Sequence, residues 1–298
     1  MTEETVQPAS HHPGEPQSGV SKDATGGSGT SASILRDAAP DGAAPQDEGS
    51  EELPPLCEDD ELGYRRSLTD FTSLLMLDES YRLAHLPLVA PEHPGVIARR
   101  EGKFYEMGRH PVVYSLVLPI EDGTLRASPG FVALGAELKA APFAGKIAWD
   151  ILPKRRGRLH ATVCGSLSLE EPPTITAETR EALRKIEPFT IELRGLFSGN
   201  VNRGRLYLPV YPEKRAGRSM LQEVQAAFGR APGDLWLVGL YNFIDDLDAA
   251  ETAALAGIVS RWWGKSLLSL TVSELQVMGA SDDLVLDAHV ETVLPLGA

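Results

Sequence analysis

Residues 158–164, Arg-Leu-His-Ala-Thr-Val-Cys, alternate apolar and polar side chains as a half-buried β-strand does. Because side chains two apart on a strand share a face, the apolar positions would face a core and the polar ones the opposite side. The polar positions beyond the first are His160, Thr162 and Cys164. An imidazole is the usual proton shuttle at neutral pH, and a nearby hydroxyl can hold a phosphate oxygen. The strand is therefore a candidate site, although a His-x-Thr pair is also typical of a purely structural contact.

The composition indicates a globular protein with a sizeable core. The chain has 298 residues, of which 42% are hydrophobic, enough for one large domain or two small ones. Cys57 and Cys164 are its only cysteines, which argues against a disulfide framework and for a reducing compartment. The N-terminus lacks the pattern of a signal peptide, and no apolar run approaches the ~20 residues of a membrane helix. We therefore expect a cytoplasmic protein without a membrane partner.

The net charge of -14 is concentrated near the N-terminus. Residues 1–61 carry a net charge of -12, and the rest of the chain carries only -2. Residues 1–54 are also rich in Gly, Pro, Ser and Ala, a composition that cannot bury enough apolar surface to fold. They are predicted to be a disordered acidic tail, either an interaction arm or a solubilising leader.

Residues 55–108 are predicted to form an N-terminal helix and an extended wrap. Apolar residues recur at helical spacing over 67–77, with Ser67 as N-cap, and the prolines of 78–108 disfavour regular structure. From residue 109 to 298 the pattern predicts a regular α+β domain. Its expected strands are 112–120, 148–152, 158–164, 189–196, 205–211, 235–243, 267–278 and 285–294. Its expected helices are 131–140, 177–186, 220–228 and 249–263.

The order of these elements suggests an internal duplication. Residues 112–164 read strand, helix, strand, strand, and residues 205–243 read strand, helix, strand. Two similar lobes facing each other across a cleft would follow from such a repeat.

Four stretches carry a resemblance to a known superfamily: 113–119 (Val-Tyr-Ser-Leu-Val-Leu-Pro), the region of Trp149, 159–163 and 191–197 (Ile-Glu-Leu-Arg-Gly-Leu-Phe). Over about residues 109–298 the chain resembles the two-histidine (2H) phosphoesterases, which include 2'-5' RNA ligase-like proteins and cyclic phosphodiesterases. The resemblance implies a two-lobed α+β fold with antiparallel sheets lining a central cleft. It also implies two His-x-Thr/Ser pairs that exchange protons around a phosphodiester, with neither metal nor cofactor.

The second pair is absent from the sequence. The strand expected to carry it, Val238–Ile244, contains no histidine. One alignment puts Leu240 and Asn242 in the places of the His and the Thr, and the other puts Tyr241 and Phe243 there. The resemblance therefore leaves His160 as the single proton shuttle and Thr162 as the phosphate grip.

A substrate-binding set completes the sequence prediction. The basic run 154–158 leads into the His160 strand and would draw in a phosphodiester, or would simply be a solvated turn. The expected substrate-binding residues are Arg158, Arg205, Tyr207, Tyr241 and Asn242. The other histidines, among them His85 and His110, are assigned no role.

The sequence thus predicts a 2H-type phosphodiesterase-like protein that acts on or binds a phosphodiester in RNA or a small (cyclic) nucleotide. The alternative is an inactive module that binds a nucleotide or a protein partner. No DNA specificity is expected, and the sequence leaves the oligomeric state open.

Overall fold

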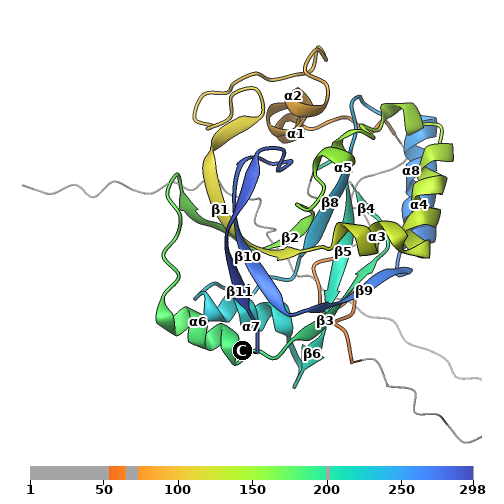
Figure 1. Cartoon of the computed structure of the whole chain (residues 1–298). Coiled ribbons are helices and arrows are strands. Elements are labelled where there is room, and N and C mark those ends of the chain that lie inside the picture. Colours follow the sequence, from red (N-terminus) through yellow and green to blue (C-terminus); the bar gives the residue numbers. More distant parts are fainter. Residues whose placement is uncertain (1–53, 65–72, 199–201, 298) are drawn as a thin grey trace, which may run out of the picture. The chain divides into compact units, whose positions relative to one another are not determined.

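The computed structural model describes residues 54–64, 73–198 and 202–297, and the chain from Pro54 onward forms one compact unit (Figure 1). The predicted acidic tail lies, apart from Pro54, outside the described residues. The helices are α1 (Glu79–Ala84), α2 (Leu86–Val89), α3 (Asp122–Ala127), α4 (Pro129–Ala140), η1 (Ala144–Lys146), α5 (Ile151–Lys154), α6 (Ala177–Arg184), α7 (Met220–Ala227) and α8 (Ala249–Trp262). The strands are β1 (Arg109–Pro119), β2 (His160–Leu169), β3 (Phe189–Arg194), β4 (Phe197–Ser198), β5 (Arg205–Pro212), β6 (Lys214–Arg215), β7 (Arg218–Ser219), β8 (Leu237–Asn242), β9 (Ser266–Val272), β10 (Glu274–Asp282) and β11 (Ala288–Pro295).

The main sheet is antiparallel and curled (Figure 1). Its strands follow one another in the order β11-β10-β1-β2-β8-β5-β3-β9, and β4 pairs with β5. The mixture of helices with an antiparallel sheet confirms the predicted α+β class. The strands belong to one continuous sheet, so the two-lobed arrangement with a central cleft stays a prediction.

The junction between β2 and β8 is the weakest link of the sheet. The two strands share one registered pair, Ala161 with Val238, whereas β1 and β2 share six. A short ladder leaves backbone carbonyl groups of both strands free to accept hydrogen bonds from side chains. The candidate site is built at this junction.

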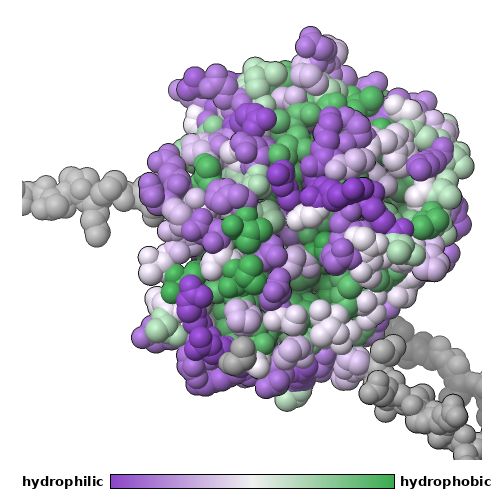
Figure 2. Space-filling view, in the orientation of Figure 1, coloured by the Kyte–Doolittle hydropathy of each residue, from purple (hydrophilic) through white to green (hydrophobic). Residues whose placement is uncertain are grey.

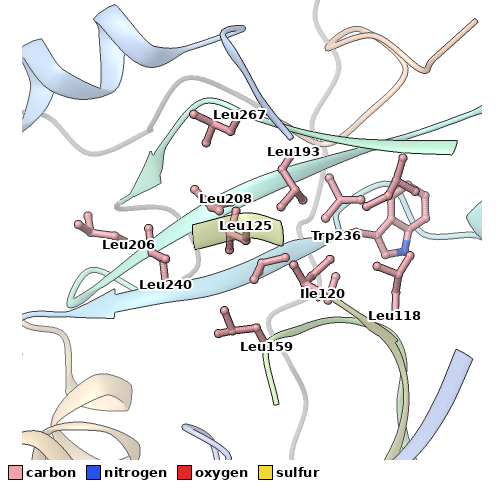
Figure 3. Packing of buried hydrophobic residues seen from close by; sticks show 14 of the residues in the cluster. Leu118, Ile120, Leu125, Leu159, Leu193, Leu206, Leu208, Trp236, Leu240 and Leu267 are labelled. Atoms are coloured by element: carbon pink, nitrogen blue, oxygen red, sulfur yellow. The ribbon is translucent and has the colours of Figure 1, made fainter. Parts of the chain in front are cut away.

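One face of the sheet carries the hydrophobic core. Figure 3 shows Leu159 of the β2 strand region with Leu206, Leu208 and Leu240 from β5 and β8 in this cluster. Each of these leucines is at most 2% exposed, so each contributes about 1.5–3 kcal/mol of transfer free energy. This burial fixes which face of β2 points outward.

Side-chain caps define the ends of the helices predicted from the sequence. Thr176 accepts a hydrogen bond from the backbone N–H of Thr179 at the start of α6. Asp248 and Glu251 cap α8 reciprocally, each accepting from the other's backbone N–H, in the capping-box arrangement. Within the described residues, no helix is both long and apolar enough to cross a membrane.

A segment near the N-terminal end of the described chain packs across β5 and β8. Leu56 forms a β-bridge with Glu213, and Cys57 is buried. The Tyr64 hydroxyl lies 2.6 Å from the carbonyl oxygens of both Val210 and Trp236, and it accepts hydrogen bonds from the backbone N–H groups of the same two residues. This segment, residues 54–64, therefore completes the ladder where β5 and β8 separate.

The predicted helix over residues 67–77 is wrong where it can be compared. Residues 65–72 lie outside the described residues, and residues 73–77 are extended, with Leu75 bridged to Leu247. The first helix is α1, inside the predicted extended wrap, and Asp78 caps it by accepting from the N–H of Tyr81. Leu75 and Leu77 are buried by pairing with the chain before α8, so tertiary contacts override their helical spacing.

Two predicted strands also need correction. Residues 148–152 form a turn and the start of α5, whose first turn tolerates Pro153. Residues 267–278 form two strands, β9 and β10, which break at Ser273 and pair with different neighbours, β3 and β1. Apolar residues on both sides of the break hide it in the sequence. The other predicted strands and helices are present, with shifted ends.

Candidate functional site

The β2 strand presents His160 and Thr162 on the face opposite the core. Leu159 and Ala161 are buried in the core, whereas His160 and Thr162 remain partly exposed. The Nδ1–H of His160 donates to the carbonyl oxygen of Arg158 at 2.8 Å, since a carbonyl can only accept. The Nε2 atom therefore carries the free lone pair. Burial, aided by the charges of Arg155 and Arg205, lowers the pKa of His160 to about 4, so the ring is neutral at pH 7.

Cys164 departs from the alternation because β2 contains a β-bulge. Val117 pairs with Thr162 but Leu116 pairs with Cys164, so Val163 is the extra residue. An extra residue reverses the alternation beyond it. Cys164 therefore faces the core with Leu116, and the expectation that it shares the His160 face is wrong. The bulge follows Thr162 and leaves the His160–Thr162 spacing intact.

The β8 strand contains a matching bulge, and this bulge decides the alignment of the second motif. Tyr207 pairs with Gly239 but Leu206 pairs with Tyr241, so Leu240 is the extra residue. Leu240 and Tyr241 consequently face the core, where Tyr241 packs against the Trp149 ring. Of the expected β8 residues only Asn242 lies on the side of Arg205, with which it pairs.

The pairing of β2 with β8 gives the positions that correspond across the junction. A half-turn about the Ala161–Val238 pair exchanges the two strands. It carries His160 onto the position of Leu237 and Thr162 onto the position of Gly239, so these are equivalent positions and not spatial neighbours. Counting back from the two bulges gives the same correspondence. By this strand pairing, Leu237-Val238-Gly239 corresponds to the His-x-Thr pair, which differs from both sequence alignments of the second motif.

A guanidinium group covers Gly239 on the His160 side. One step along the antiparallel ladder from Ala161–Val238, His160 comes beside Gly239. A Cβ atom built on Gly239 would overlap the guanidinium of Arg205, so only glycine leaves room for it. Arg205 is 9% exposed, and its guanidinium carbon lies 5.5 Å from the centre of the Tyr207 ring. The group that faces His160 across the junction is thus a permanent cation.

A second guanidinium, that of Arg155, reaches the same residue from the end of α5. Arg155 is 1% exposed, and its Nη1 donates to the carbonyl oxygen of Gly239 at 2.8 Å. Burial and the neighbouring charge of Arg205 lower its pKa. Among the ion pairs of the described residues, none includes Arg155 or Arg205, and the buried Nε atom of each lacks a hydrogen-bond partner there.

His85 packs against this pair of arginines from the end of α1. Its ring stacks on Tyr81, and its Nε2 lies 3.4 Å from Nη1 of Arg205. Because a guanidinium only donates, Nε2 must be the accepting nitrogen. Burial lowers the pKa of His85 to about 3, so the ring stays neutral and orients Arg205.

The loop between β10 and β11 closes over the arginines. The Asp283 carbonyl accepts from Nη1 of Arg205 at 3.2 Å, and its carboxylate is paired with His110 at 3.3 Å. Burial alone would lower the pKa of His110, but its hydrogen bonds to Asp283 and the Pro111 carbonyl and the charges of Asp283 and Asp282 together raise it. Arg158 donates to the Leu286 carbonyl at 2.6 Å. Arg205 and Arg158 therefore both donate hydrogen bonds to this loop and hold it in place.

The structure brings together most of the predicted site residues. Those on the His160 face are His160, Thr162, Arg205, Tyr207 and Asn242. Arg158 lies at its edge, where its guanidinium holds the loop between β10 and β11 instead of standing free for a substrate. Tyr241 lies on the core face, away from the other predicted substrate-binding residues. Hydrophilic residues gather over α5, which precedes Arg155 (Figure 2).

Sequence reasoning missed Arg155, His85 and Asp283. Arg155 belongs to the basic run 154–158, which was predicted either to attract a phosphodiester or to form a solvated turn. Nothing in the sequence of this run indicates that Arg155 is buried. His85 and Asp283 come from segments far from His160 in the sequence. Only Gly239, a glycine within an apolar strand, offered a signal, because such a glycine often marks a bulge or a close approach.

Comparisons with known proteins give a limited likeness. No family model matches the chain, and no curated protein matches it. Among solved structures, E. coli LigT in complex with NADP+ is similar to the chain, with a TM-score of 0.35 and 16% identity over 63% of this chain and 100% of LigT. LigT in its apo form gives a TM-score of 0.36 and 17% identity over 63% of this chain and 99% of LigT. Overlaps of this extent do not assign a family, and the residues of the chain itself carry the functional proposal.

Proposed function

We propose that this protein is a 2H-type phosphodiesterase-like protein that binds and cleaves a phosphodiester of RNA or of a small nucleotide on the His160 face. The observation that supports it most is the gathering of an imidazole, a hydroxyl and a guanidinium, from His160, Thr162 and Arg205, on one face at the β2–β8 junction. A base, a hydrogen-bond donor and a fixed positive charge are what in-line attack of water on a phosphorus atom needs.

His160 has the arrangement of a general base, although its pKa of about 4 makes it a weaker base than an unperturbed imidazole. Its Nδ1 is held by the Arg158 carbonyl, which leaves Nε2 free to take a proton from water or a ribose hydroxyl. Thr162 and Asn242 would donate to the phosphate oxygens, and Arg205 would neutralise the charge. Tyr207 is 6% exposed beside Arg205, and an aromatic ring there suits a nucleobase or a sugar face.

An alternative function, binding without turnover, follows from a specific observation. The counterpart of His160 on β8 is Leu237, which transfers no proton. A panel of 2',3'-cyclic nucleotides and short 2'-5' and 3'-5' oligonucleotides, assayed for both binding and cleavage, separates the two functions. Cleavage that His160→Ala abolishes supports the enzyme, binding without cleavage supports the alternative, and neither activity contradicts both.

A further inference from the structure

On the His160 face, the described residues supply a base and two cations but no good proton donor. The nearby His110, whose pKa is raised, has both ring nitrogens engaged, by the Pro111 carbonyl and by Asp283. His160 and His85 are both neutral at pH 7, because burial lowers their pKa values to about 4 and about 3. Leu237 occupies the place that corresponds to His160. Burial raises the pKa of the Tyr207 phenol to about 12, far from the neutral value that suits a general acid. Arg205 and Arg155 hold charge and do not exchange protons.

Without a proton donor, the site favours substrates whose leaving group is weakly basic. An alcohol leaves as an alkoxide about as basic as hydroxide, whose conjugate acid has a pKa of about 15.7, so it needs a proton during bond breaking. A phosphate leaving group is far less basic, since its second pKa is about 6. It departs unprotonated if positive charge meets the developing negative charge on its oxygen.

The two guanidiniums provide that charge at one point. Arg205 lies against the Cα side of Gly239, and Arg155 donates to the carbonyl of the same residue. The nearest carboxylates are committed elsewhere: Asp283 to His110 and Tyr105, and Asp282 to three backbone N–H groups of its own loop. Two buried cations that form no ion pair within the described residues suit the combined charge of two adjacent phosphates.

We infer that the substrates of this site are small nucleotides in which two phosphates are joined by a P–O–P bridge, with Arg205 and, behind Gly239, the buried Arg155 supplying the positive charge that offsets the two phosphates. The inference rests on the proposed function and narrows its substrate class. His160 takes one proton from water as the water oxygen bonds to one phosphorus. The bond from that phosphorus to the bridging oxygen breaks, and the second phosphate leaves with the electron pair. His160 then releases its proton to solvent, which completes the hydrolysis to two monophosphates.

The test compares leaving groups on the full-length protein. Its substrates are diadenosine diphosphate, with a P–O–P bridge, and the 3'-5' dinucleotide ApA and 2',3'-cyclic AMP, with alcohol leaving groups. We expect kcat/KM for diadenosine diphosphate to exceed that for the other two by about 100-fold or more, the value of one missing proton shuttle. Equal rates, or a preference for the alcohol leaving groups, would overturn the inference while leaving the proposed phosphodiesterase intact.

Variants separate charge from structure. Arg205→Met, which replaces a buried cation with an apolar side chain of similar length, should lower kcat for diadenosine diphosphate by about 10²–10³, and Arg205→Lys should lower it less. Gly135→Ala, in open space on α4, is the control and should change nothing. Melting curves identify variants that fail to fold, and Arg155→Met then provides an independent test of the second cation. Folded arginine variants with wild-type kcat would contradict the role of the two cations.

Tyr207 needs its own control because it carries a hydroxyl on the same face. Phenyl and nitrophenyl esters of thymidine 5'-phosphate differ mainly in the acidity of the leaving phenol. If Tyr207 only contacts the ligand, Tyr207→Phe lowers the rates of both esters by the same factor. A larger loss for the phenyl ester would make Tyr207 the general acid and overturn the inference.

Binding of a methylene-bridged analogue of diadenosine diphosphate, measured by calorimetry, separates the two levels of the proposal. If the analogue binds but the protein cleaves none of the substrates, the inference is overturned and the binding alternative stands. If the protein neither binds the analogue nor cleaves any substrate, the proposed function fails as well.

Discussion

The strands β2 and β8 share a backbone plan and differ in their side chains. Each carries a two-residue outward pair followed by a bulge, at Val163 in β2 and at Leu240 in β8. The outward pair is His160 and Thr162 on β2, and Leu237 and Gly239 on β8. The missing side chain at Gly239 makes room for Arg205. The comparison teaches that β2 presents an imidazole and a hydroxyl on this face, whereas β8 presents a glycine that leaves room for the positive charge of Arg205 from β5.

The largest expected effect removes the chemistry of β2. His160→Ala should lower kcat by about 10²–10⁴, because it removes the general base, whereas ligand affinity should stay within about tenfold through Thr162 and Arg205. Steady-state kinetics and calorimetry measure the two quantities. Unchanged turnover in this variant would contradict the proposed role of His160 as the general base and the comparison between the strands.

The second effect restores the chemistry on β8. Leu237→His places an imidazole at the counterpart of His160, at a position that is partly exposed as His160 is. We expect a gain of up to about 10² in turnover of 2',3'-cyclic AMP, whose leaving group needs a proton. Leu240→His is the matched control, since its side chain faces the core and should only destabilise the fold. A gain in Leu240→His and none in Leu237→His would refute the alignment set by the bulges.

The third effect is a pH dependence of stability that comes from His160 and His85. Both folded-state pKa values lie below the unfolded value of about 6.5, so unfolding takes up protons between about pH 6.5 and 4. The free energy of unfolding should therefore fall as the pH falls, by about 1.4 kcal/mol per pH unit for each imidazole. Urea denaturation at pH 6 and 5 measures it. The slope should decrease by about half in His160→Gln; an unaltered slope there would show that the ring of His160 is solvated.

His110 acts in the opposite direction and in another window. Its pKa is raised by Asp283, so its contribution to stability is complete below about pH 6.5 and is lost as the pH rises through the folded value. A His110→Gln variant should therefore lose more stability at pH 6 than at pH 8. The difference isolates the loop between β10 and β11 from the β2–β8 junction.

The smallest expected effect tests the close contact between Gly239 and the Arg205 guanidinium. Gly239→Ala forces its methyl group into the Arg205 guanidinium and should destabilise the fold by about 1–3 kcal/mol. Gly135→Ala, which meets nothing within 4 Å, should be neutral or stabilising by up to about 1 kcal/mol. Thermal melts of both variants measure the difference. Equal melting temperatures would mean that Arg205 can leave Gly239 freely.

Sequence reasoning succeeded where alternation is uninterrupted and failed where it shifts. The outward face of His160 and Thr162 was predictable because the bulge in β2 comes after them. In β8 the bulge falls at Leu240, so uninterrupted alternation places the residues on its two sides incorrectly in both of the sequence alignments. A single extra residue has no signature in composition, since it depends on the partner strand.

The partners of the candidate site were unpredictable for another reason. Arg155, His85 and Asp283 belong to a short helix, a helix end and a loop whose positions are set by tertiary packing. Local pattern describes neighbours in the chain, and these residues meet only through the curled sheet. By contrast, caps such as Thr176 and Asp248 act within four residues of the chain and were predictable.

The Tyr64 hydroxyl has a consequence for the order in which the protein folds. It bonds to Val210 and Trp236, which lie 146 and 172 residues further along the chain. Closing such long loops is slow, because their entropy is lost before the contacts that compensate for it form. During synthesis, Tyr64 emerges long before either partner strand exists. The β5–β8 ladder can therefore be completed only late in translation, and until then the exposed edges of these strands need protection from pairing with other chains.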